Sequence, residues 1–206
     1  METLRKNIFL LVLLLVCSSA FSQSADATQN AFVRSYVAEN EKNYPLAISE
    51  LKNIYQPDDY VINIRLGWLN YLAKQYTESA NYYKKSIAVR PYAIEARFGC
   101  VKPLSALEDW ESVKKQYLEI LNIDPQNTLA NYWLGVVYYN RKDFLSAVKL
   151  FEKVVNLFPL DYDSVIMLAW AKLKSNKPAE AKVLFQQALI IRPNDSSALA
   201  GLKLVL

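Results

Sequence analysis

The sequence predicts an all-α fold built from repeated helical hairpins, and three observations lead to this prediction. Pro91, Pro125, Pro159 and Pro193 follow one another at intervals of 34 residues. An apolar helical pattern precedes each of them, and proline ends a helix because it cannot continue the hydrogen-bond ladder. The chain of 206 residues contains only four glycines, which argues against an all-β fold rich in tight turns.

Composition and length are those of a folded protein of moderate size. Hydrophobic residues make up 52% of the chain and charged residues 21%, which excludes an intrinsically disordered chain. The net charge of +4 is small, and the basic residues alternate with acidic ones. We therefore expect no nucleic-acid binding, which needs clustered lysine and arginine.

The N-terminus has the features of a secretory signal peptide. Arg5 and Lys6 precede an aliphatic run over residues 8–16, and small residues surround Ala20 and Ser22. A basic start, a short apolar core and a small-residue exit are typical of a cleaved leader. We therefore expect a bacterial protein that is periplasmic or secreted.

Two alternatives to cleavage remain open. The apolar run over residues 8–21 is short of the roughly 20 residues that a spanning helix needs, which argues against a retained anchor. Cys17 directly follows the apolar core, as the acylated cysteine of bacterial lipoproteins does, although Val16 stands where a small residue is usual. The alternative prediction is thus a protein anchored in the outer membrane.

One of the 34-residue periods carries an extended motif. Within residues 128–161 it reads Leu134, Gly135, Tyr138, Ala147, Phe151 and Pro159. Its order and spacing resemble those of the tetratricopeptide repeat. Small residues let two antiparallel helix backbones approach closely, and the large ones fill the space beside them.

This resemblance implies an α-solenoid of antiparallel helical hairpins in a superhelix. The expected segments are a signal peptide over 1–22, a degenerate helical hairpin over 23–59, repeats over 60–93, 94–127, 128–161 and 162–195, and a capping helix over 196–206. The repeat over 94–127 is divergent, because Val101 stands at the small position and Pro103 lies inside its first helix. The matching framework positions elsewhere are Leu66, Gly67, Tyr83, Pro91, Tyr117, Pro125, Ala181, Phe185, Ala188 and Pro193.

The residue types exclude most catalytic sites. The chain has no histidine, so His-dependent triads and His-containing metal sites are absent, and it has no glycine-rich phosphate loop. We expect no cofactor and no enzymatic activity. The acidic pairs at 58–59 and 108–109 lie in predicted turns, where we expect carboxylates to cap helices or face water and not to act as paired catalytic acids. Asp195 or Ser196 is expected to cap the last helix, and Cys100 to be a small buried residue.

The resemblance also implies a binding surface. In tetratricopeptide proteins the first helix of each repeat lines a concave groove that holds a peptide or a partner helix. In register, the groove positions here are Ile64, Trp68, Tyr71, Phe98, Lys102, Ser105, Tyr132, Val136, Tyr139, Ile166, Trp170 and Leu173. Such aromatic side chains suit interfaces. They can equally fill the inner wall, or be covered by the chain's own N-terminal segment or C-terminal helix.

The sequence therefore predicts a non-enzymatic scaffold outside the cytoplasm that binds a peptide or helical segment of another protein. A carboxylate clamp for cytosolic chaperones is not expected, because only Lys102 fits its pattern. The alternative is a membrane-tethered assembly factor for outer-membrane or surface structures, acylated at Cys17. A cell-wall hydrolase would need one distinct glutamate, and the sequence distinguishes none. Self-association through the C-terminal helix stays open.

Overall fold

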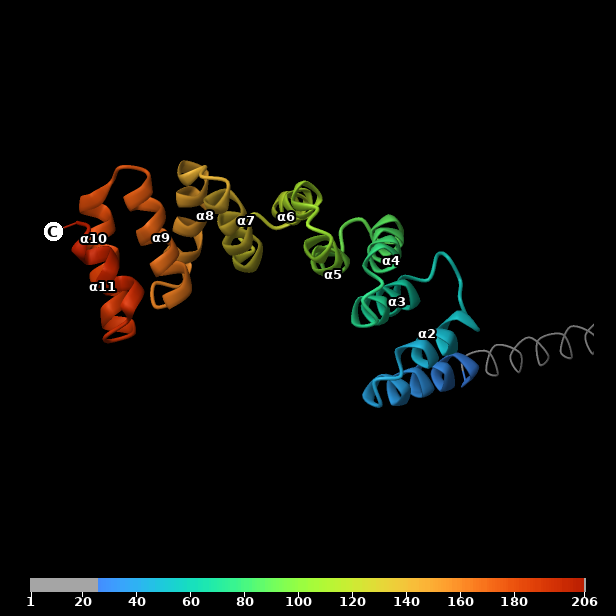
Figure 1. Cartoon of the computed structure of the whole chain (residues 1–206). Coiled ribbons are helices and arrows are strands. Elements are labelled where there is room, and N and C mark those ends of the chain that lie inside the picture. Colours follow the sequence, from blue (N-terminus) through green and yellow to red (C-terminus); the bar gives the residue numbers. More distant parts are fainter. Residues whose placement is uncertain (1–25, 206) are drawn as a thin grey trace, which may run out of the picture. The chain divides into compact units, whose positions relative to one another are not determined.

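The computed structural model describes residues 26–205, and every regular element in that range is a helix. The predicted signal peptide and Cys17 lie outside the described residues. The chain divides into two compact units, one ending at Pro91 and the other beginning at Tyr92. Figure 1 shows the order of the helices along the chain. The predicted all-α class is confirmed.

The described part of the first unit, residues 26–91, contains four helices. A helix ending at residue 40 precedes α2 (Tyr44–Lys52), α3 (Tyr60–Leu72) and α4 (Tyr76–Val89). Along the chain α2 packs on α3, and α3 packs on α4. The apolar centre of this unit includes Leu51, Leu66 and Leu69, each fully buried.

The second unit is a row of hairpins that ends in a single helix. Its helices are α5 (Ile94–Ala106), α6 (Trp110–Ile123), α7 (Thr128–Asn140), α8 (Phe144–Leu157), α9 (Tyr162–Lys174), α10 (Pro178–Ile191) and α11 (Ser196–Lys203). Each helix from α5 to α10 packs on the next helix along the chain, and α11 contacts both α9 and α10 (Figure 1). Proline at the first position of α10 suits a helix start.

Within a hairpin, a small residue of the first helix packs against an aromatic ring of the second helix. A Cβ atom added to Gly135 of α7 would lie 2.7 Å from Cε1 of Phe151 in α8. In the first unit a Cβ on Gly67 would lie 2.9 Å from the ring of Tyr83. Ser79, which replaces the usual alanine, donates a 2.6 Å hydrogen bond to the carbonyl oxygen of Gly67. The rings thus occupy the space that the glycines leave.

The divergent repeat keeps its first helix despite its unusual residues. Pro103 lies inside α5 and is buried, and the helix continues to Ala106. Val101 and Tyr117 are both buried in this hairpin. Cys100 is fully buried, which confirms the interpretation of its side chain as part of the interior.

In the last repeat, Lys172 takes the place of the motif tyrosine. Its side chain is 7% exposed, and its Nζ atom lies 2.5 Å from carboxylate oxygens of Glu152 and Glu180. Burial opposes the charged form, but the hydrogen bonds to the two carboxylates outweigh it and raise the pKa of Lys172. This cation therefore links α8, α9 and α10.

The turn inside each hairpin has one residue in the left-handed region. These residues are Lys42, Lys74, Glu108, Lys142 and Asn176, with φ between 58° and 63°. In the third repeat the Asp143 N–H bonds to the Tyr138 carbonyl at 3.0 Å, and the Lys142 N–H bonds to the Tyr139 carbonyl at 2.9 Å. This pair of bonds is a Schellman motif, which satisfies the last carbonyls of the first helix.

Side-chain caps begin most of the helices. Asp59 caps α3 and Asp109 caps α6, while Asp58 and Glu108 are exposed, so each acidic pair supplies one cap and one residue that faces water, as expected. Asp195 caps α11, as one of the two predicted candidates. Hydrogen bonds from Ser146 lower the pKa of Asp143, the cap of α8. Each cap satisfies an N–H group that the helix leaves without a partner.

We expect Gly135→Ala to destabilise the protein by about 1 to 3 kcal/mol, because the added methyl group overlaps the Phe151 ring and forces the helices apart. Chemical denaturation measures the change. In a Phe151→Leu background the smaller side chain leaves room for the added methyl group, so Gly135→Ala should destabilise the protein much less. An alanine penalty that is the same in both backgrounds would contradict the proposed contact.

We expect Lys142→Gly to stabilise the protein by about 0.5 to 1 kcal/mol, because glycine adopts a positive φ without the steric cost that lysine carries. Thermal and chemical denaturation provide the measurement. Lys149→Gly, an exposed position inside α8, is the matched control and should cost about 1 kcal/mol. Equal destabilisation by both changes would show that the turn is not strained at Lys142.

Candidate partner-binding site

The predicted groove residues of the first unit are engaged within that unit. The indole N–H of Trp68 donates a 2.7 Å hydrogen bond to a carboxylate oxygen of Glu39. The ring of Tyr71 lies 5.9 Å from that of Trp68 and 5.8 Å from that of Tyr76, between centroids. Ile64 is half-buried. Trp68 therefore joins the N-terminal helix to α3.

The predicted groove residues on α9 are also largely used in packing. The indole N–H of Trp170 donates a 2.9 Å hydrogen bond to the Ser197 hydroxyl in α11, and its ring packs edge-on against Phe185 at 5.0 Å. Ile166 is only 8% exposed, and Leu173 packs on the same cluster. The C-terminal helix thus contacts the indole that the groove prediction assigned to a partner.

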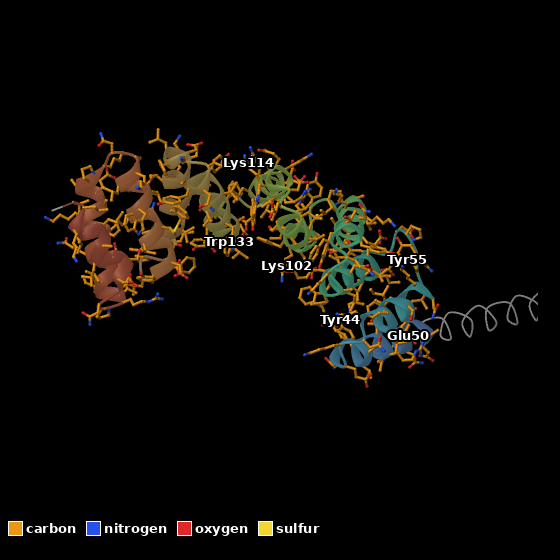
Figure 2. The ribbon with its side chains drawn as sticks, in the orientation of Figure 1. Tyr44, Glu50, Tyr55, Lys102, Lys114 and Trp133 are labelled. Carbon is orange, nitrogen blue, oxygen red and sulfur yellow. The ribbon has the colours of Figure 1, made fainter. Side chains whose placement is uncertain are left out.

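The remaining predicted groove residues lie on α5 and α7. Phe98 packs against Tyr117 at 6.4 Å, and Tyr139 packs against Phe144 at 5.3 Å. Burial raises the pKa of Tyr139. Lys102 is exposed on α5, where Figure 2 labels it. Tyr132, by contrast, also lines a hollow.

This hollow, of about 780 Å³, lies at the ends of α7, α8 and α9 and belongs entirely to the second unit. We call it the α7–α9 hollow. Its lining combines the start of α7, the end of α8 and the turn that leads into α9. The lining residues are Thr128, Leu129, Tyr132, Trp133, Val154, Leu157, Phe158, Pro159, Leu160, Asp161, Asp163 and Ser164.

Apolar side chains at its edge are open to solvent. Leu160 is 74% exposed, Phe158 54% and Trp133 44%. The rings of Tyr132 and Trp133 pack edge-to-face with their centroids 5.2 Å apart. The centroid of the Tyr132 ring lies 5.8 Å from that of the buried Phe151 ring. Figure 2 labels Trp133 on α7. Contiguous exposed apolar groups of this kind mark interaction sites more often than isolated ones do.

Two small changes in the repeat open this hollow. In the last repeat the Arg192 guanidinium lies 3.7 Å from the ring centroid of Tyr162. The first unit has the same pair in register, Arg90 over Tyr60 at 4.8 Å. In the repeat over 128–161 these two positions are Phe158 and Thr128. A threonine cannot fill the volume of a tyrosine ring, so the space beside it stays open.

The hollow is acidic at one side. Asp161 and Asp163 are among its lining residues, and none of its lining residues is lysine or arginine. Burial raises the pKa of Tyr132, with further contributions from Asp163 and Asp161. The hydroxyl oxygen of Ser164 is buried and has no hydrogen-bond partner among the described residues.

Backbone and side-chain hydrogen bonds fix the turn between α8 and α9, which lines one side of the hollow. The Phe158 N–H bonds to the Val154 carbonyl at 2.8 Å, and Asp161 caps α9 through the Ser164 N–H at 3.2 Å. From α10 the Gln187 amide donates a 2.6 Å hydrogen bond to the Pro159 carbonyl. The exposed apolar residues therefore project from a fixed backbone.

The groove prediction did not include most of this surface. The missed residues are Leu129, Trp133, Leu157, Phe158 and Leu160. A signal for them lies in the register itself. The positions that match Phe158 in the other repeats are Arg90, Asp124 and Arg192, all charged. An apolar residue at a position that the framework leaves to charged residues is a candidate for binding.

No helix within residues 26–205 is long and apolar enough to cross a membrane. No group of three or more histidine, cysteine, aspartate or glutamate side chains in that range is placed to hold a metal ion.

Comparisons with known sequences identify the repeat. A family model described as the tetratricopeptide repeat matches residues 140–205. The chain is 31% identical over 142 residues to the BBSome complex member BBS4 of Mus musculus, covering 65% of this chain and 27% of that protein. It is 33% identical over 129 residues to BBS4 of Bos taurus, covering 60% and 24%. The chain thus spans about a quarter of the length of these curated relatives.

Solved structures share the fold at low sequence identity. A tetratricopeptide repeat protein from Parabacteroides merdae matches with a TM-score of 0.74 and 16% identity, over 87% of this chain and 72% of that one. The MamA protein matches at 0.71 and 16%, over 81% and 92%. YrrB, described as having an unusual peptide-binding site, matches at 0.71 and 13%, over 90% and 97%. The motif, the family model and the fold agree: the chain carries the tetratricopeptide repeat over residues 140–205, and its described helices have the α-solenoid fold of solved tetratricopeptide repeat proteins.

Proposed function

We propose that this protein is a non-enzymatic interaction scaffold that acts outside the cytoplasm and holds a segment of another protein in the α7–α9 hollow. The observation that carries the proposal is the exposed apolar edge of this hollow, where the other repeats have charged residues at the position of Phe158. The tetratricopeptide fold supports a role in protein–protein interaction, and such proteins generally lack enzymatic activity.

The physical case for binding is the removal of this apolar surface from water. Leu160, Phe158 and Trp133 stay exposed in the folded unit, and burying a large apolar side chain contributes roughly 1.5 to 3 kcal/mol. Their backbone is already fixed by the turn before α9, so little ordering is needed on binding. Aromatic anchors in a preformed pocket are typical of interface hot spots.

The hollow is a better candidate than a groove centred on the tryptophans of α3 and α9. Trp68 and Trp170 already donate hydrogen bonds to Glu39 and Ser197. A partner that used either indole would have to break this bond or leave it in place and meet only part of the ring. Tyr132 is the residue that the two surfaces share.

We propose a location outside the cytoplasm because of the N-terminal sequence, which has a basic start, an apolar run over residues 8–16 and small residues around Ala20. The second candidate is a membrane-tethered assembly factor for outer-membrane or surface structures. It is favoured by one observation, the position of Cys17 directly after the apolar run. The hollow would serve a partner in either case.

Site-specific photo-crosslinking in the producing cell tests the binding site. A photoreactive phenylalanine in place of Leu160 or Trp133 should form an adduct with the same partner, because both side chains border the hollow. Ile190, which is 80% exposed on α10 and does not line the hollow, is the matched control and should not form that adduct.

The variant Thr128→Tyr/Phe158→Arg should abolish this adduct at the Leu160 position, since it copies the Tyr162–Arg192 pair and fills the hollow. Its thermal unfolding midpoint should match that of the unmodified chain. An adduct that survives this change, or that forms equally from Ile190, would assign the partner to another surface.

Intact-mass measurement of the protein from soluble and membrane fractions tests the location. We expect a soluble chain that begins at Phe21 or Gln23, since cleavage after either small residue removes the apolar run. A membrane-bound chain that begins at Cys17 with added acyl mass would favour the tethered assembly factor. A full-length chain in the cytoplasmic fraction would contradict both.

A further inference from the structure

We propose that the segment held in the α7–α9 hollow carries an aromatic side chain next to an arginine or lysine. This inference rests on the proposed function, because it names the chemistry of the partner for the same site. It follows from what the matching positions of the last repeat contain and from the charge of the hollow.

The last repeat shows which groups this part of the fold accommodates. The Arg192 guanidinium lies over the Tyr162 ring, and the Tyr162 hydroxyl is hydrogen-bonded to the Asp195 carboxylate. Burial and then this hydrogen bond raise the pKa of Tyr162 to about 12. The bond to Tyr162 and those to the start of α11 lower the pKa of Asp195. A ring, a cation and a carboxylate therefore form one cluster.

The α7–α9 hollow contains only part of this cluster. Asp161 matches Asp195 in the 34-residue register and likewise caps the next helix. The ring position is Thr128 and the cation position is Phe158. The carboxylate is thus retained, while the ring and the cation that accompany it in the last repeat are missing. A partner side chain pair of these two types would complete the arrangement.

The charges in the hollow favour a basic group. Asp161 and Asp163 line it without a lysine or arginine among the lining residues, although the chain as a whole has a net charge of +4. A guanidinium or ammonium group can form charge-assisted hydrogen bonds with these exposed carboxylates.

The apolar edge favours an aromatic neighbour for that cation. Trp133 and Phe158 are aromatic and half or nearly half exposed, and Tyr132 already makes an edge-to-face contact with Trp133. A further ring would extend this contact and fill the volume beside Thr128. Aromatic pairs contribute more than their buried area alone.

Selection from a random peptide library tests this chemistry without a known partner. A phage library of random twelve-residue peptides is selected on the purified protein, with counter-selection on Thr128→Tyr/Phe158→Arg. We expect the enriched peptides to combine an aromatic residue with arginine or lysine within two positions. Trp133→Ala should weaken the binding of a synthetic peptide of the enriched sequence, while Ile190→Ala, at an exposed site outside the hollow, should leave it unchanged.

Neutralising the carboxylates provides the second arm. Asp161→Asn keeps a helix-capping side chain, and Asp163→Asn is at an exposed position, so the double variant retains the fold. It should lower the affinity for the synthetic peptide about threefold, as expected for the loss of exposed ion pairs. Asp143→Asn, a cap at the start of α8, is the control and should leave binding unchanged.

The outcomes separate this inference from the proposed function. Peptides that are apolar or acidic, and still require the open hollow, would overturn the basic–aromatic chemistry and keep the binding site. No enrichment over the filled variant would overturn both. If the unmodified chain forms a dimer and Thr128→Tyr/Phe158→Arg dissociates it, the hollow binds a second copy of the chain. That result would overturn the inference.

Discussion

The close approach of two helix backbones, with a ring beside a small residue, is the contact on which the rest of this structure depends. Gly135 leaves room for the Phe151 ring, and Gly67 leaves room for the Tyr83 ring. Because Phe151 is fully buried, this contact fixes both the separation of the helices and their register. The turns and caps then follow, since the left-handed residue and the next N-cap must occupy fixed places in each period.

Once this framework is set, the positions outside it are free to vary, and the α7–α9 hollow results from such variation. Tyr162 and Arg192 close the matching space in the last repeat by a cation–π contact. Thr128 and Phe158 leave it open without changing the hairpin. The repeat therefore tolerates an apolar, acidic depression because its own stability comes from the helix contacts beside it. This separation of stability from binding is the property that lets one repeat serve many partners.

The aromatic residues divide between these two roles in a way that their number does not reveal. An indole N–H must find an acceptor when it leaves water, and in both Trp68 and Trp170 the acceptor comes from this chain. Trp133 is next to the predicted groove residue Tyr132, was not itself predicted, and stays nearly half exposed. The prediction of an aromatic binding surface therefore depended on which aromatics the neighbouring helices had already engaged.

The sequence by itself determined the helical class and the 34-residue hairpins, and it indicated caps in the acidic pairs and at Asp195 or Ser196, because these depend on local chemistry within a few residues. Only the tertiary structure decided which side chains remain open to a partner. Exposure depends on contacts between residues far apart in the chain, such as Trp170 with Ser197, 27 positions later. A periodic pattern places a side chain on a face of its helix, but it does not say what covers that face.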